Sequence, residues 1–88
     1  MNAPASLYHL SSCPFCHKVR RAAAELGIEL NLIDIAESPE AREHLRAERG
    51  RTTVPVLSIP TAQGEVLLPE SDDIIAYLQA HVAELRAA

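Results

Sequence analysis

Short apolar runs along the chain alternate with longer segments that repeat apolar side chains every three or four residues. The short runs predict four strands, at residues 5–10, 29–35, 56–59 and 65–68. The helical spacing predicts three helices, at residues 14–26, at residues 39–49 and from residue 71 onward. The apolar stripe of the last helix consists of Ile74, Ile75, Leu78, Val82 and Leu85.

Local signals mark where the predicted helices begin and end. Pro14 fits the first helical position, where its missing N–H costs nothing, and Gly27 supplies a stop. Ser38-Pro39-Glu40 combines a capping side chain, a first-turn proline and an acid that complements the helix dipole. Gly50 ends this second helix, which is mostly polar and is therefore expected on the surface.

The order of the elements predicts an α/β fold, β-α-β-α-β-β-α. A parallel βαβ unit with a right-handed crossover precedes an antiparallel hairpin, whose connection is residues 60–64. These parts make a four-stranded mixed sheet with helices on both faces. A chain of 88 residues has room for one core, so we expect a single domain spanning residues 1–88.

Composition narrows the classes of function. The net charge is −4 and the basic residues are scattered apart from Arg20-Arg21, which argues against nucleic acid as a partner. No apolar run is long enough to cross a membrane, and residues 1–6 lack the pattern of an export signal. We therefore expect a cytoplasmic protein, in a compartment where a structural disulfide would not persist. We also expect it to be a monomer.

Both cysteines lie in Cys13-Pro14-Phe15-Cys16, at the junction of the first strand and the first helix. At the helix cap, a Cys13 thiolate would meet unpaired N–H groups and the positive end of the helix dipole. Cys16 lies one turn further and is more shielded, which suits a resolving thiol. This context favours a redox motif. A zinc site would need about four ligands, of which the cysteines supply half.

A second candidate site is Thr53-Val54-Pro55, directly before the third strand. A cis Val54–Pro55 bond would direct the Val54 backbone outward, where a peptide-like substrate could pair with it as a strand does. The alternative is an ordinary trans proline at the start of a strand. The residues alone leave this alternative at least as favoured, because cis bonds are a minority even before proline.

The third candidate site is Pro69-Glu70-Ser71-Asp72-Asp73, at the start of the last helix. Helix N–H groups and the Ser71 hydroxyl suit a carboxylate, and Glu70 or Asp72 could accept from an ammonium group. Together they would hold an amino-acid head group that carries both charges. The alternative is simple capping with acids in the first turn, which the residues alone favour.

These three segments, in this order, resemble the glutaredoxins over nearly the whole chain. Cys13-Pro14-Phe15-Cys16 is similar to the family's Cys-Pro-Tyr-Cys, and Thr53-Val54-Pro55 to its Thr-Val-Pro loop. The resemblance implies a thioredoxin fold, a cis Pro55 and a Val54 backbone that pairs with the cysteine of glutathione. It also implies that Ser71 and Asp72 bind the γ-glutamyl end, and that Arg42 reaches the glycine carboxylate.

The chain departs from the glutaredoxin pattern at two places. Pro69-Glu70 stands where the family has two glycines, and Leu10 stands where it often has a lysine. Pro69-Glu70-Ser71, followed by Ile75 and Tyr77-Leu78, is instead similar to the amino-terminal domain of glutathione transferases. There Glu-Ser binds the same γ-glutamyl group, which implies that role for Glu70 and Ser71.

The resemblance implies a glutathione-dependent thiol–disulfide oxidoreductase that needs no metal. Cys13 would attack disulfide-bearing or glutathionylated proteins, and glutathione or Cys16 would resolve the mixed disulfide. Three alternatives remain. They are a thioredoxin-like protein reduced by a flavoprotein, a non-catalytic transferase-like module that binds glutathione or a protein, and a dimeric iron–sulfur cluster carrier that uses Cys13 and glutathione.

Overall fold

A computed structural model describes residues 5–86 of the chain. Residues 1–4 and 87–88 lie outside the described part. The predicted domain of residues 1–88 is therefore described except at its two ends. Most of residues 1–6, the segment searched for an export signal, also lies outside the described part.

The elements follow one another in the predicted order, with one difference at the carboxyl end. They are β1 (Ser6–His9), α1 (Pro14–Glu25), β2 (Asn31–Asp34), α2 (Pro39–Arg49), β3 (Val56–Thr61), β4 (Gly64–Pro69), α3 (Ser71–Ala80) and α4 (Val82–Arg86). We predicted one last helix, but the backbone leaves helical geometry at His81 (φ −123°, ψ 29°). The apolar stripe did not reveal this break, because Val82 and Leu85 still pack against the same core as α3.

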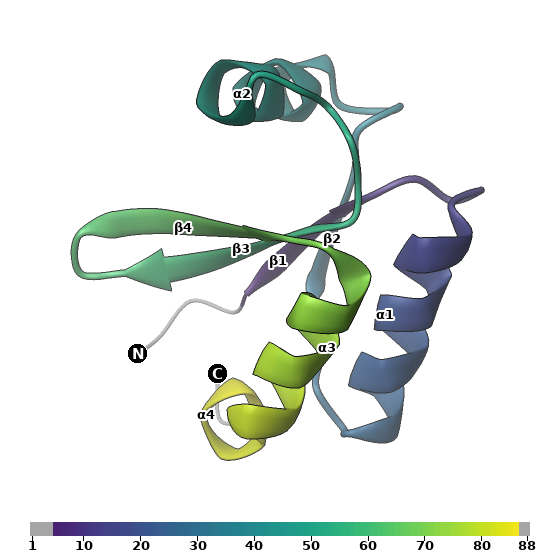
Figure 1. Cartoon of the computed structure of the whole chain (residues 1–88), viewed down its shortest axis with the longest axis vertical. Helices are drawn as coiled ribbons and strands as arrows, with labels where there is room; N and C mark the ends of the chain where they lie inside the picture. The colour runs from purple at the N-terminus through teal and green to yellow at the C-terminus, as the bar shows by residue number, and fades with distance from the viewer. Residues whose placement is uncertain (1–4, 87–88) are drawn as a thin grey trace.

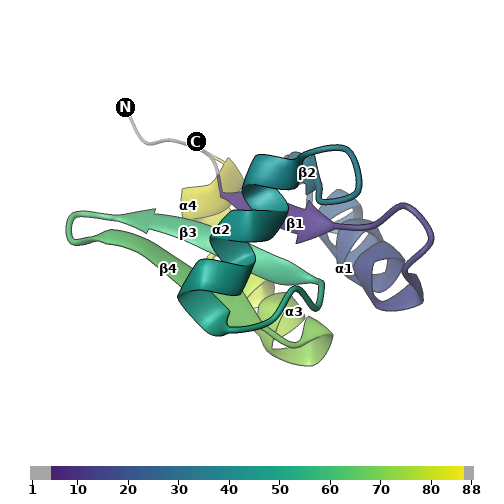
Figure 2. The same ribbon diagram turned by 90° about the horizontal axis from the view of Figure 1, so that it is seen from above.

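The sheet has the order β2-β1-β3-β4. β1 runs parallel to β2 and antiparallel to β3, and β4 pairs with β3 as the antiparallel hairpin. α1 and α3 cover one face of the sheet and α2 covers the other (Figures 1 and 2). The predicted four-stranded mixed sheet with helices on both faces is confirmed.

The larger core lies between the sheet and the pair α1 and α3. Successive side chains of a strand point to opposite faces, so Leu7 enters this core while Tyr8 faces α2. The buried members of the larger core are Ala5, Leu7, Val19, Ala23, Ile28, Leu57, Ile74 and Leu78.

α2 lies on the other face and buries little of its own surface, as its polar sequence predicted. Leu45 is its one buried residue, with none of its surface exposed. A polar network helps to hold α2, because His44 Nε2 lies 2.6 Å from Glu65 Oε1 while Ser58 donates to the other carboxylate oxygen. Burial works to raise the pKa of Glu65, but the hydrogen bonds from Ser58 and His44 outweigh it and lower that pKa.

The predicted ends of α2 are confirmed. Ser38 Oγ accepts a hydrogen bond from the Ala41 N–H at 3.3 Å, and Gly50 ends the helix with φ 73°. None of the helices within residues 5–86 is long and apolar enough to cross a membrane.

Candidate active site

Cys13 occupies the N-cap of α1. Its backbone is extended (φ −85°, ψ 116°), and its Sγ accepts a hydrogen bond from the Cys16 N–H at 3.3 Å. The half-buried thiol also lies 3.9 Å from the carbonyl oxygen of Val54, to which it donates. A thiolate here would sit against the positive end of the helix, the arrangement that makes a cysteine nucleophilic.

Cys16 lies one turn into α1 and has none of its surface exposed. Burial, followed by its hydrogen bond with Cys13, raises the pKa of the Cys16 thiol to about 12, against a smaller opposing effect of the Leu10 backbone. Cys16 is therefore a protonated, shielded thiol at neutral pH. Of the two sulfurs, Cys13 is the one that a substrate can reach.

The Val54–Pro55 peptide bond is cis. The trans alternative, which the residues alone left open, is therefore wrong, and the isomer implied by the family resemblance is present. Pro55 is buried directly before β3, whereas Val54 is half-buried and directs its carbonyl at Cys13. Within residues 5–86 the Val54 N–H has no hydrogen-bond partner, so it remains available to an extended ligand.

The start of α3 lies next to this loop. Ser71 is its first residue, and Glu70 is the cap, with a positive φ of 73° and ψ of 122°. Among the described residues, no side chain forms a cap hydrogen bond here, so the capping half of the simple alternative is wrong. Its other half holds, because Asp72 and Asp73 lie in the first turn. The backbone N–H groups of the first turn are left open to a ligand.

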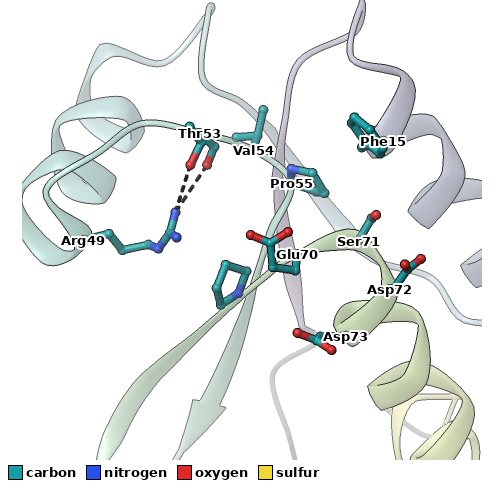
Figure 3. Close-up of a pocket in the computed structure, with 10 residues that line it drawn as sticks. Phe15, Arg49, Thr53, Val54, Pro55, Glu70, Ser71, Asp72 and Asp73 are labelled. Atoms are coloured by element: carbon teal, nitrogen blue, oxygen red, sulfur yellow. Dashed lines mark hydrogen bonds between the residues drawn. The ribbon is translucent and has the colours of Figure 1, made fainter.

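One open pocket of about 440 Å³ connects the loop and the helix start. It brings together the predicted residues Thr53, Val54, Pro55, Glu70, Ser71 and Asp72. In Figure 3 the Glu70 carboxylate points toward the loop that holds Thr53 and Val54, and the Ser71 hydroxyl points toward the side of the pocket where Phe15 lies. Phe15, with 62% of its surface exposed, forms part of the wall. The lining therefore combines an exposed backbone, a helix N-terminus and carboxylates.

Arg42 does not line this pocket. It lies on a neighbouring hollow of about 380 Å³, together with Thr52. Arg49 lines the pocket instead, and its Nη1 is 3.4 Å from both the carbonyl oxygen and the Oγ1 of Thr53. Sequence reasoning missed Arg49, although it lies two turns after Arg42 on the same side of α2.

An exposed ion pair joins the two helices at the edge of the pocket. Lys18 Nζ on α1 lies 2.6 Å from Asp72 Oδ1 on α3. The side chains are 52% and 83% exposed, so solvent screens the pair and its contribution to stability is small. Among residues 5–86, no group of three or more histidine, cysteine or acidic side chains could hold a metal ion.

Comparisons with known proteins connect this geometry to a family. Residues 7–85 match the family model of the glutathione S-transferase amino-terminal domain. The chain is 30% identical over 77 residues to a glutaredoxin of Pseudomonas aeruginosa, which covers 88% of this chain and 87% of that protein. It is also 30% identical over 57 residues to glutaredoxin 3 of Escherichia coli K12. This match covers 65% of the present chain and 69% of glutaredoxin 3.

Two solved structures share the architecture. Wheat glutaredoxin superposes with a TM-score of 0.71 at 30% identity, over 98% of this chain and 85% of the wheat protein. NrdH-redoxin of Escherichia coli, described as a glutaredoxin-like protein with a thioredoxin-like activity profile, gives a TM-score of 0.65 at 30% identity. This match covers 82% of this chain and 91% of NrdH-redoxin. The predicted thioredoxin fold is confirmed.

The different surroundings of the two thiols predict selective alkylation. When the reduced protein is treated with iodoacetamide at neutral pH, we expect Cys13 to react at least about 100-fold faster than Cys16, because Cys16 is buried and protonated. Mass spectrometry of proteolytic peptides measures both rates. The control is the same reaction in denaturant, where both cysteines should be labelled. Comparable rates in the folded protein would contradict this assignment of the thiols.

The backbone conformation of Glu70 predicts that a glycine at this position stabilises the protein. A residue with a side chain is strained at φ 73°, so Glu70→Gly should raise the free energy of unfolding by about 1 kcal/mol. Glu70→Ala is the matched control, since it removes the carboxylate but keeps the strain. Urea unfolding at neutral pH measures both variants. A Glu70→Gly protein no more stable than Glu70→Ala would show that this backbone is unstrained.

Proposed function

This chain belongs to the glutaredoxin family of thiol–disulfide oxidoreductases, and we propose that it takes its electrons from glutathione through Cys13. The observation that carries the proposal is the pocket beside Cys13. Its lining offers the Val54 backbone, the open start of α3 and three carboxylates within one space of about 440 Å³. A tripeptide with a thiol in the middle and charged groups at its ends matches such a lining.

In the proposed reaction the Cys13 thiolate attacks one sulfur of a protein disulfide or of a glutathione mixed disulfide. The substrate S–S bond breaks, a new S–S bond forms at Cys13, and the other sulfur leaves as a thiolate. When glutathione is left on Cys13, a second glutathione thiolate attacks it and forms glutathione disulfide. When a protein is left on Cys13, Cys16 can attack instead and close an internal disulfide.

The cysteine of glutathione would pair with the backbone of Val54. The carbonyl oxygen of Val54 already lies 3.9 Å from Cys13 Sγ, so a ligand extended along this loop brings its own sulfur to the reactive one. Main-chain pairing of this kind gives affinity without demanding a particular side chain. Thr53 and Pro55 flank the same stretch of backbone and line the pocket with it.

The γ-glutamyl end would bind at the start of α3. Its carboxylate suits the open N–H groups and the Ser71 hydroxyl, and its ammonium suits Glu70 or Asp72. Lys18 already pairs with Asp72 at 2.6 Å, so the ligand ammonium would have to replace Lys18 there. The pair is exposed, and such pairs contribute about 0–1 kcal/mol, which makes the exchange inexpensive.

Arg49 is our preferred partner for the glycine carboxylate. It lines the same pocket as Val54 and Ser71, whereas Arg42 lines the neighbouring hollow. A guanidinium can hold a carboxylate through two parallel hydrogen bonds. Arg42 remains a second candidate, because it projects from the same helix two turns earlier.

A thioredoxin-like dithiol route is the second candidate function. The likeness to NrdH-redoxin, with its thioredoxin-like activity profile, favours this alternative. In that route electrons enter from a protein reductase, and both cysteines are needed for every substrate. The lining of the pocket favours glutathione, because a route that uses protein reductases alone has no use for paired carboxylates beside a free helix start.

Variants of the two cysteines test the proposal. The assay is the reduction of a glutathionylated disulfide substrate by glutathione, coupled to glutathione reductase. We expect Cys13→Ser to lose activity at least about 1000-fold, because it lacks the nucleophile. Cys16→Ser should keep activity within a few-fold of the wild type, because glutathione resolves the intermediate itself.

Two outcomes would reject the proposal in different ways. Equal activity in the wild type and Cys13→Ser would remove Cys13 from the reaction. Complete loss of activity in a folded Cys16→Ser protein would instead favour the thioredoxin-like route, in which the second thiol is always required.

A further inference from the structure

A buried histidine near the active site has no role in the reaction described so far. His9, the last residue of β1, keeps only 7% of its surface exposed. Its Nδ1 atom is buried and has no hydrogen-bond partner among the residues that the structure describes. Buried polar atoms are nearly always paired, and an unpaired one costs about 1–3 kcal/mol. This nitrogen therefore needs an explanation.

The strand register places His9 on the same side of the sheet as the two cysteines. Leu7 packs into the core with Val19 and Ala23 of α1, and His9 lies two residues further along the same face. The chain reverses direction between β1 and α1, so His9 and Cys16 lie at the same end of this layer.

Two neighbouring residues, Pro55 and Leu10, show more closely where His9 lies. β1 and β3 pair Tyr8 with Val56, and continuing this antiparallel register by one residue sets His9 beside the cis Pro55. The backbone of the next residue, Leu10, reaches both cysteines. The carbonyl oxygen of Leu10 accepts a hydrogen bond from the Cys13 N–H at 3.1 Å. A backbone hydrogen bond from Leu10 to the Cys16 sulfur works to lower the pKa of that thiol.

Other ionisable groups surround this end of the sheet. Besides the cysteines, α1 contributes Arg20, whose positive charge works to lower the pKa of the Cys16 thiol. β2 contributes Asp34, in register with His9, but one of its carboxylate oxygens already accepts from the Ala36 N–H at 2.8 Å. At the start of α3, Asp72 is paired with Lys18, and Asp73 is exposed. His9 is the buried base among them.

We infer that His9 accepts the proton of the Cys16 thiol when Cys16 attacks a mixed disulfide on Cys13. A buried thiol has no water to take its proton, and a neutral imidazole has one nitrogen able to do so. This inference rests on the dithiol branch of the proposed function and is independent of glutathione.

The step balances. The Cys16 S–H bond breaks and its proton moves to the imidazole, while the sulfur electron pair attacks Cys13 Sγ. The S–S bond between Cys13 and the substrate breaks, the substrate sulfur leaves as a thiolate, and the Cys13–Cys16 disulfide forms. The two protein thiols are oxidised and the substrate disulfide is reduced. The imidazolium then returns its proton to the leaving thiolate or to solvent.

A two-phase thiol release experiment isolates this step. The reduced protein is mixed with dithiobis(nitrobenzoate), which releases one coloured thiolate when Cys13 attacks and a second when Cys16 resolves the mixed disulfide. We expect His9→Asn to leave the first phase unchanged and to slow the second at least about 10-fold at neutral pH. The difference should shrink at alkaline pH, where hydroxide can deprotonate Cys16.

Matched variants and the wild type make the test decisive. Cys16→Ser should show the first phase alone. His81→Asn should behave as the wild type, because it removes an imidazole that is far from the cysteines in the chain and whose Nδ1 lies 3.4 Å from Glu84 Oε2. A second phase as fast in His9→Asn as in the wild type would overturn the inference.

The wild type gives a second test that does not depend on how the variants fold. The rate of its second phase should stop rising toward alkaline pH, because a group of the protein and not hydroxide takes the proton. A rate that keeps rising tenfold per pH unit toward alkaline pH would show that hydroxide takes the proton, and it would equally overturn the role of His9.

Discussion

The hydrogen bond from the Cys16 N–H to Cys13 Sγ, 3.3 Å long, is the interaction on which the active site depends. It fixes the sulfur at the amino end of α1, where the helix dipole favours a thiolate. The same turn carries Cys16 inward, out of contact with solvent. One local geometry therefore gives the two thiols different surroundings, with Cys13 half-buried and Cys16 fully buried, as the proposed division into attacking and resolving thiols requires.

The sheet brings the remaining parts of the site to this sulfur. β1 and β3 are the inner strands, so the loop that enters β3 must pass the end of β1 where α1 begins. The cis bond before Pro55 lies in this loop, and the carbonyl of Val54 faces Cys13. β4 then leads directly into α3, whose start closes the pocket. Segments far apart in the sequence thus line one pocket (Figure 3), and its Val54 lies beside Cys13.

Local signals predicted the elements and the positions of the cysteines, because caps, prolines and stop glycines act within one turn. Gly50 ends α2 as expected, whereas the break at His81 left no local signal, since apolar residues pack on both sides of it. The isomer before Pro55 could not be derived from the residues alone, because both isomers fit the same local sequence. Arg49 and the His44–Glu65 pair depend on how α2 docks, which only the tertiary structure supplies.

At Glu70 the chain has a residue with a side chain where the glutaredoxin pattern has a glycine, and the backbone there has a positive φ, which glycine tolerates best. The retained backbone and the added carboxylate together suit a site that holds the ammonium of glutathione. The most direct test of whether this pocket binds glutathione is a crystal structure of the Cys16→Ser protein with glutathione disulfide-bonded to Cys13. We expect the tripeptide to pair with Val54 and to place its γ-glutamyl end at Ser71 and Glu70. A tripeptide that leaves the start of α3 empty and extends into solvent would contradict this assignment of the pocket.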